Sequence, residues 1–242
     1  MKRVFVVGCP RSGTTLVQSI LNSHSKMKSF PESHIFTSSL FDLNWRMYGP
    51  LIGRREWPHH VVGLAKNRIG IASACAKNRA QIFLSQANLY NETFEHLSTT
   101  TSLRCLSKKL CEILDRNGGY SGWIEKTPNN VFFCDIIERY IENPIFIHVI
   151  RDGRDSISSI YDAAHKYESW QERYLRGSKS IDRLCNLWIR STSESWKQRK
   201  KRNHMIIYYE NISNNPELEV SSICKFIGID LIEQPDGCKF GL

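Results

Sequence analysis

Apolar residues occur along the chain in short unbroken runs, and stretches with helical spacing follow these runs. The clearest runs predict β-strands at 4–7 (VFVV), 144–150 (PIFIHVI) and 204–209 (HMIIYY). The run at 144–150 is typical of a central parallel strand that is covered on both faces. Helical spacing follows the runs at 14–21, 152–165 and 216–227.

The remaining segments extend this alternation. A short strand is predicted at 123–124, and Pro128 opens a helix that runs to about 141. A further helix is predicted at 181–199, residues 60–114 are expected to be mostly helical, and residues 30–54 are expected to be irregular. Strands that alternate with helices predict an α/β fold: a three-layer open parallel β-sheet flanked by helices, in one domain over 1–242. Its ligand site should lie at the carboxyl ends of the strands.

A glycine-rich loop, GCPRSGTT at 8–15, joins the first predicted strand to the first helix. Backbone N–H groups in such a loop converge at a helix N-terminus and favour a bound phosphate. The spacing is that of the nucleoside-triphosphatase loop, which makes the expected sheet P-loop-type, but Thr14 replaces the lysine and disfavours a kinase or ATPase. Arg11 and the hydroxyls of Thr14 and Thr15 can instead hold a phosphate and a neighbouring sulfate. A strand-to-helix turn without a ligand is the alternative interpretation.

A second set of polar residues follows the buried strand at 144–150. Arg151 stands at the carboxyl end of that strand, and Ser159 lies two turns into the next helix on about the same face. The two residues could together hold a second anion. Alternatively, Arg151 forms only an ion pair with Asp155 at the start of the helix.

Composition narrows the choice of ligand. Lys and Arg number 33 against 24 Asp and Glu, a formal charge of +9 that favours an anionic ligand. Nucleic-acid binding is not expected because no DNA- or RNA-binding motif accompanies this charge, and the basic run at 197–202 is interpreted as a solvated helix end. The eight cysteines form no CxxC pair, so no metal site is predicted and a reducing cytoplasmic location is expected. The chain has no apolar run long enough for a membrane span.

The two loop motifs together resemble those of sulfotransferases that use 3′-phosphoadenosine 5′-phosphosulfate (PAPS), in particular the bacterial, Golgi-type and tyrosylprotein-type members. These motifs are PRSGTT at 10–15 and RDGRDSISS at 151–159, and the resemblance covers residues 4 to about 229. It departs at Gly153, where the family usually has proline. The resemblance implies transfer of a sulfuryl group to an acceptor hydroxyl or amine, with adenosine 3′,5′-bisphosphate (PAP) as product and no metal. It implies that the nucleotide is bound by Pro10, Arg11, Ser12, Gly13, Thr14, Thr15, Arg151, Ser159 and Tyr209.

The resemblance also implies catalytic residues. Lys126, in the IEKTP motif, would neutralise the bridging oxygen, and Arg11 would stabilise the transferring group. Glu32 has a similar spacing from the loop to the catalytic glutamate of the tyrosylprotein-type enzymes and is the expected general base. For Glu32, the alternative is a solvated loop carboxylate. For Tyr209, the alternative is a residue that only caps the end of a core strand. His34, His148 and His165 are weaker base candidates, and His148 is interpreted as a hydrogen-bonded core histidine.

Two other functions stay open on the sequence alone: a P-loop kinase whose lysine is Lys126, and a nucleotide-binding module without catalysis. The acceptor cannot be identified, although the basic surface favours an acidic or polysaccharide one, and residues 57–114 and 167–176 are expected to line its site. The chain stops soon after its last predicted helix, which indicates either a reduced lid or a chain shortened at the C-terminus. The oligomeric state is not determined.

Overall fold

A five-stranded parallel sheet forms the centre of the protein. The computed structural model describes residues 1–39, 43–48, 65–66, 69–72, 75–92, 102–119, 121–174 and 180–230. The strands are β1 (Lys2–Gly8), β2 (Met27–Phe30), β3 (Gly122–Lys126), β4 (Pro144–Ile150) and β5 (His204–Tyr208). Their order in the sheet is β2-β3-β1-β4-β5, and every pair is parallel. The predicted α/β class with an open parallel sheet is therefore confirmed.

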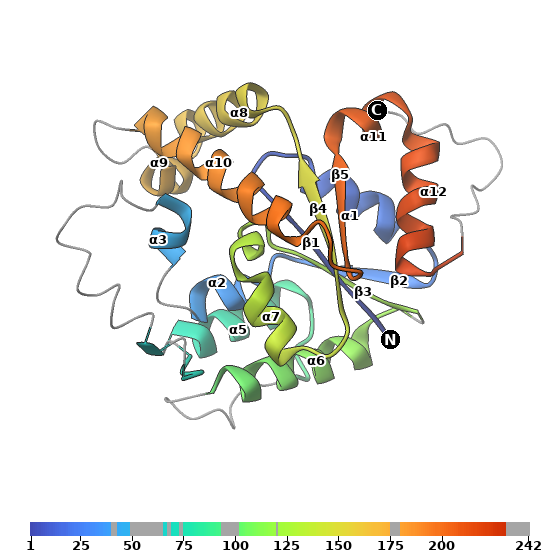
Figure 1. Ribbon diagram of the computed structural model, residues 1–242. Coiled ribbons are helices and arrows are strands. Elements are labelled where there is room, and N and C mark those ends of the chain that lie inside the picture. Colours follow the sequence, from blue (N-terminus) through green and yellow to red (C-terminus); the bar gives the residue numbers. More distant parts are fainter. Residues whose placement is uncertain are drawn as a thin grey trace.

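Helices cover both faces of this sheet (Figure 1). They are α1 (Thr14–Asn22), α2 (Ile35–Ser39), α3 (Leu43–Tyr48), α5 (Cys75–Gln86), α6 (Leu103–Asn117), the 3-10 helix η3 (Pro128–Phe133), α7 (Cys134–Tyr140), α8 (Gly153–Lys166), α9 (Glu168–Tyr174), α10 (Ser180–Gln198), α11 (Tyr209–Asn214) and α12 (Pro216–Ile227). Within the ranges given above, no helix combines the length and the apolar character that crossing a bilayer requires.

Side-chain alternation along the central strand divides the core in two. Val4 and Val6 of β1 pack with apolar residues of α1, α11 and α12. Phe5 and Val7 point to the opposite face, where α2, α5, α6, α7, α8 and α10 contribute to a larger cluster. Both faces of β1 are therefore dry, as its uninterrupted apolar sequence indicates.

Several elements differ from the sequence expectation. The helices α2 and α3 lie in the segment 30–54 that was expected to be irregular. The strand β2 was not predicted, because this four-residue edge strand (MKSF) contains a lysine and a serine between its two buried ends. The segment after Pro128 begins as a 3-10 helix and becomes α-helical only at Cys134. Tyr209 is the first residue of α11 and does not belong to β5.

The expected acceptor-lining segments fall only partly within the described residues. The helices α5 and α6 confirm helical structure in their part of 60–114. Residues 51–64, 93–101, 175–179 and the last twelve residues, 231–242, lie outside the described part of the chain. The expectations for the lid and for most of the acceptor side therefore stay predictions.

Candidate active site

At two positions of the glycine loop, Gly8 and Gly13, the structure leaves no room for a side chain. Gly13 caps the N-terminus of α1 with φ of 96°, and a Cβ added there would come within 2.3 Å of Cδ2 of Tyr209. Gly8 ends β1, and a Cβ there would lie 2.4 Å from the carbonyl oxygen of Val149 in β4. Arg11 between them also has a positive φ, 66°. The loop is thus wrapped tightly over the ends of β1 and β4, with α1 starting directly behind it.

A cavity of about 330 Å³ lies over the carboxyl ends of β1, β3 and β4. It brings together all but one of the residues that the sequence analysis assigned to nucleotide or catalysis, and these are Pro10, Arg11, Gly13, Thr14, Thr15, Glu32, Lys126, Arg151, Ser159 and Tyr209. Six further described residues line the cavity, and these are Leu16, His34, Pro128, Asn129, Trp170 and Tyr174. The loops that precede α1 and α8 therefore share one site.

Ser12 is the predicted site residue whose side chain does not reach the cavity lining. It is fully buried, and its Oγ has no hydrogen-bond partner within the described part of the chain. Its N–H donates to the carbonyl oxygen of Cys9 at 3.2 Å, inside the loop. Oγ lies 3.0 Å from the position of a Cβ added to Gly8, which places the hydroxyl underneath the loop. Ser12 thus packs the loop against β1 in this structure.

Arg151 and its neighbours link the two loops. Nη1 of Arg151 donates to the carbonyl oxygen of Arg11 at 3.4 Å, and Nε of Arg11 donates to Oγ of Ser159 at 3.0 Å. The Arg151 guanidinium also lies 4.5 Å from the centre of the Tyr209 ring and 3.5 Å from Oδ2 of Asp155. The ion pair at the helix start therefore exists, but the guanidinium still faces the glycine loop. Its buried Nε has no partner among the described residues, so a donor is available there.

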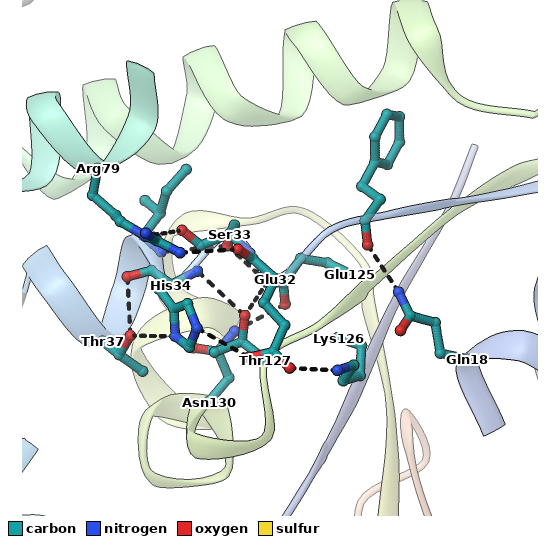
Figure 2. A network of polar contacts seen from close by, with 12 residues as sticks. Gln18, Glu32, Ser33, His34, Thr37, Arg79, Glu125, Lys126, Thr127 and Asn130 are labelled. Carbon is teal, nitrogen blue, oxygen red and sulfur yellow. Dashed lines mark hydrogen bonds and ion pairs between the residues drawn. The ribbon is translucent and has the colours of Figure 1, made fainter. Parts of the chain in front are cut away.

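Glu32 lies between two basic side chains on the other side of the cavity (Figure 2). Nζ of Lys126 pairs with its Oε1, and Nε2 of His34 lies 2.9 Å from its Oε2. Burial raises the pKa of Glu32, but hydrogen bonds from His34 and Lys126 outweigh burial and lower it to about 2. Glu32 is therefore an ionised, paired carboxylate and does not have the surroundings of a freely solvated loop residue.

Four residues beneath this group were missed by the sequence analysis. Glu125 is completely buried, and its carboxylate accepts hydrogen bonds from Ser33, Thr127 and Asn130. A charged residue inside a short apolar strand was the one available signal, because a buried carboxylate requires partners. The partners themselves have no sequence pattern that points to them.

The two other candidate histidines do not line the cavity. His148 has 0% exposure and is hydrogen bonded to Oγ of Ser195 at 3.0 Å and to Nδ1 of His204 at 2.8 Å. This confirms His148 as a core histidine with satisfied hydrogen bonds. Sγ of Cys134 lies within 4.8 Å of this histidine pair, a grouping that spacing along the chain did not reveal, but we assign no metal to it because the ring nitrogens already pair with each other. His165 is exposed and contacts the carbonyl oxygen of Tyr161.

The geometry defines the kind of ligand that fits. One group in the cavity is the helix N-terminus with Arg11, Thr14 and Thr15, and directly beside it lie the Arg151 guanidinium and the Ser159 hydroxyl. Such groups bind oxyanions, so a nucleotide with an anion at each end fits both. Fold and site together define an α/β protein of the P-loop type with a cavity suited to such a nucleotide at the carboxyl edge of its sheet.

Comparison with known proteins gives the family. The family model described as "Sulfotransferase family" matches residues 3–233. The chain therefore belongs to the sulfotransferase family, whose members transfer sulfuryl groups. The predicted family is confirmed.

Individual relatives are distant. Protein-tyrosine sulfotransferase 2 of Gallus gallus is 20% identical over 235 residues, which cover 95% of this chain and 52% of the relative. The chain thus spans about half the length of that relative. Among solved structures, the sulfotransferase domain from the curacin biosynthetic pathway has a TM-score of 0.57 at 20% identity, covering 98% of this chain and 78% of that one. A mouse sulfotransferase solved with PAP has a TM-score of 0.50 at 11% identity, covering 95% and 60%. These likenesses support the fold.

Proposed function

We propose that this protein transfers the sulfuryl group of PAPS to an acceptor hydroxyl or amine. The observation that carries the proposal is the placement of Lys126 and Glu32 in the same cavity as two separate anion-binding groups. Sulfuryl transfer resembles phosphoryl transfer in needing aligned oxygens and cations where charge develops. PAPS carries anionic groups on both its 3′ and 5′ sides and supplies the group that is transferred.

Each part of the site has a distinct role in this proposal. The loop N–H groups with Arg11, Thr14 and Thr15 hold the 5′ end, and Arg151 with Ser159 holds the 3′-phosphate beside Tyr209. Lys126 neutralises the bridging oxygen as the bond to it breaks. Glu32 accepts the proton of the acceptor. The required positive charge comes from side chains and loop N–H groups, so the proposal includes no metal ion.

The acceptor side is formed by the residues of the cavity that belong to neither anion-binding group. His34, Asn129, Trp170 and Tyr174 line it, and two of these are aromatic. The Gallus gallus relative is named a protein-tyrosine sulfotransferase. We therefore propose tyrosine peptides as the first acceptors to test.

We also propose a reducing cytoplasmic location, since Cys9 and Cys111 are buried thiols and burial raises the pKa of each to about 12.

Calorimetry and transfer assays on two variants test the proposal. PAP should bind without metal and more tightly than ATP with Mg²⁺. Glu32→Gln should lower kcat by about 100-fold or more because the base is lost, while PAP affinity stays nearly unchanged. Arg151→Ala should chiefly weaken PAP binding, by about 10-fold or more.

Three results would contradict the proposal. Metal-dependent binding of ATP in preference to PAP would favour a kinase. PAP binding without transfer to any acceptor would leave a nucleotide-binding module. Full turnover by Glu32→Gln would remove Glu32 as the base while leaving the nucleotide assignment standing.

A further inference from the structure

Glu125 contacts the segment that carries Glu32, although it does not line the cavity itself. Its Oε1 accepts hydrogen bonds from the N–H of Ser33 at 3.1 Å and from the hydroxyl of Ser33 at 2.7 Å. The hydroxyl of Thr127 donates to the same oxygen, and Nδ2 of Asn130 donates to Oε2 at 3.0 Å. A carboxylate has about four lone-pair sites, so Glu125 uses its capacity almost fully (Figure 2).

The segment from Glu32 to His34 is held by further contacts. The N–H of His34 donates to Oγ1 of Thr127 at 3.3 Å, which extends the Glu125 group by one residue. From α5, Arg79 donates to the carbonyl oxygen of Ser33 at 3.2 Å and to that of Glu32 at 3.4 Å. His34 has a positive φ of 50°, a conformation that non-glycine residues adopt only when their surroundings stabilise it. The hydrogen bonds around it therefore fix an unfavourable backbone.

The position of Glu125 in β3 gives these bonds a functional consequence. Successive side chains of a strand point in opposite directions, so Glu125 extends beneath the segment of Glu32 while Lys126 extends into the cavity. Lys126 pairs with the carboxylate of Glu32, and Glu125 binds the backbone of the next residue, Ser33. Two consecutive residues of β3 thus hold the Glu32 side chain and the backbone of the residue that follows it.

From this geometry we infer that Glu125 is a positioning residue, which fixes the carboxylate of Glu32 relative to Lys126 and the donor. The inference rests on the proposed function for its catalytic meaning. Displacement of a reacting group by about 1 Å can lower turnover by roughly 100-fold. Loss of the Glu125 contacts should therefore lower kcat and leave PAP affinity intact, because the residues proposed to hold PAP belong to other loops.

Variants of Thr127 provide the most selective test, since they change one donor to Glu125 and leave Glu125 itself and its other partners in place. Thr127→Val keeps the shape of the side chain but removes the hydroxyl, whereas Thr127→Ser keeps the hydroxyl. We expect Thr127→Val to lower kcat about 10- to 100-fold with PAP affinity within about 3-fold, and Thr127→Ser to restore most of the rate. Glu125→Gln should resemble Thr127→Ser. Oδ1 of Asn130 has no hydrogen-bond partner among the described residues, so it can accept from the new amide once the Asn130 side chain rotates.

Ser195→Ala is the matched control, because it removes a buried hydrogen bond to His148 and neither of these residues lines the cavity. It should lower thermal stability comparably and leave kcat unchanged. A readout that does not depend on activity is the pKa of the Glu32 carboxyl, followed by ¹³C NMR. This pKa should rise from about 2 toward its ordinary value in Thr127→Val and stay in place in Ser195→Ala.

The outcomes separate this inference from the proposed function. A wild-type protein without transferase activity would refute the function, while the Glu32 pKa would still test the positioning. Unchanged kcat and unchanged Glu32 pKa in Thr127→Val would refute the positioning role. Parallel losses of stability, PAP affinity and turnover in Thr127→Val, without rescue in Thr127→Ser, would also refute it.

Discussion

At the scale of single residues, Glu32 and Lys126 form an ion pair with each other in this structure. Glu32 has a pKa of about 2 because of its hydrogen bonds, so it is a weak base while both partners remain in place. The ammonium of Lys126 has three protons, so it can keep one on Glu32 while another faces the bridging oxygen. A shift of Lys126 toward the donor would raise the basicity of Glu32 at the moment when the acceptor must lose its proton.

A second residue-scale effect concerns stability in acid. Burial, together with neighbouring His204, lowers the pKa of His148 from 6.5 to about 3. Between these values the unfolded chain binds a proton at this position and the folded chain does not, so stability falls as the pH falls from about 6.5 toward 3. Each such proton changes the unfolding free energy by about 1.4 kcal/mol per pH unit.

We therefore expect His148→Gln to flatten the dependence of unfolding free energy on pH. Denaturant unfolding between about pH 6.5 and 5.5 measures this slope, because this range lies above the ordinary pKa of Glu138, 4.5, whose own folded pKa is lowered to about 2. His165→Gln is the control, because His165 is exposed and its loss should leave the slope unchanged. Equal slopes in wild type and His148→Gln would show that His148 titrates normally.

Sequence alone located most of the residues that line the cavity but not those that support them. Arg151 and Ser159 could be paired because eight positions place two side chains on one helix face, and Thr14 stood at a recognisable place in the loop. His34 was named only as a weaker candidate, and Glu125, Thr127 and Asn130 were not found. Their roles depend on contacts between β3 and the segment after β2, and no local periodicity encodes such contacts.

At the scale of elements, the site depends on three adjacent strands. β1 pairs with both β3 and β4, so the loops after these strands meet at one edge. Long apolar runs made β1 and β4 predictable from sequence, whereas β2 was hidden because an edge strand of four residues buries too little to need such a run. The 3-10 helix η3 was equally unpredictable. Its Asn130 side chain is hydrogen bonded to the buried Glu125, a contact that the sequence does not reveal.

The junction between β1 and α1 allows a direct test with Gly13→Ala. A methyl group there would meet the Tyr209 ring at 2.3 Å and stand on a backbone with φ of 96°, so Tyr209 must move. Arg151 packs on the same ring, and we expect PAP affinity to fall about 10-fold or more. Isothermal titration calorimetry measures the change.

Gly228→Ala serves as the control for this experiment. Gly228 also has a positive φ, 75°, but it caps α12, and among the described residues a Cβ there would meet the flexible end of Lys2. This variant should lose about 1 kcal/mol of stability through the same backbone strain and bind PAP normally. Equal loss of PAP affinity in both variants would show that backbone strain, and not the displacement of Tyr209, determines binding.

At the scale of the whole molecule, the site joins segments that are far apart in the sequence. Arg11 and Ser159 are hydrogen bonded although 148 positions separate them, and the carbonyl of Arg11 contacts Arg151. The affinity of a ligand that bridges the two loops should therefore depend on the groups at both ends of the ligand. The formal charge of +9 adds a general attraction for anions but does not determine which anion binds.

Comparison of PAP with 5′-AMP tests this bridging. The missing 3′-phosphate should weaken binding to the wild type by roughly 10- to 100-fold, because charge-assisted hydrogen bonds are lost. In Arg151→Ala the two nucleotides should bind within about 3-fold of each other, since the partner of the 3′-phosphate is absent. Arg154→Ala is the control, because the Arg154 side chain is 92% exposed and pairs with Asp152. Undiminished discrimination in Arg151→Ala would place the 3′-phosphate elsewhere.

The in-register pairing of β1 with its two neighbours has a practical consequence. Val6 lies beside Lys126, and Gly8 lies beside Val149, so the backbone pairing sets where Lys126 and Arg151 leave the sheet relative to the glycine loop. Trp170 and Tyr174 come from α9, outside the sheet. An engineer could therefore rebuild α9 for a new acceptor without disturbing the distances on which handling of the donor depends.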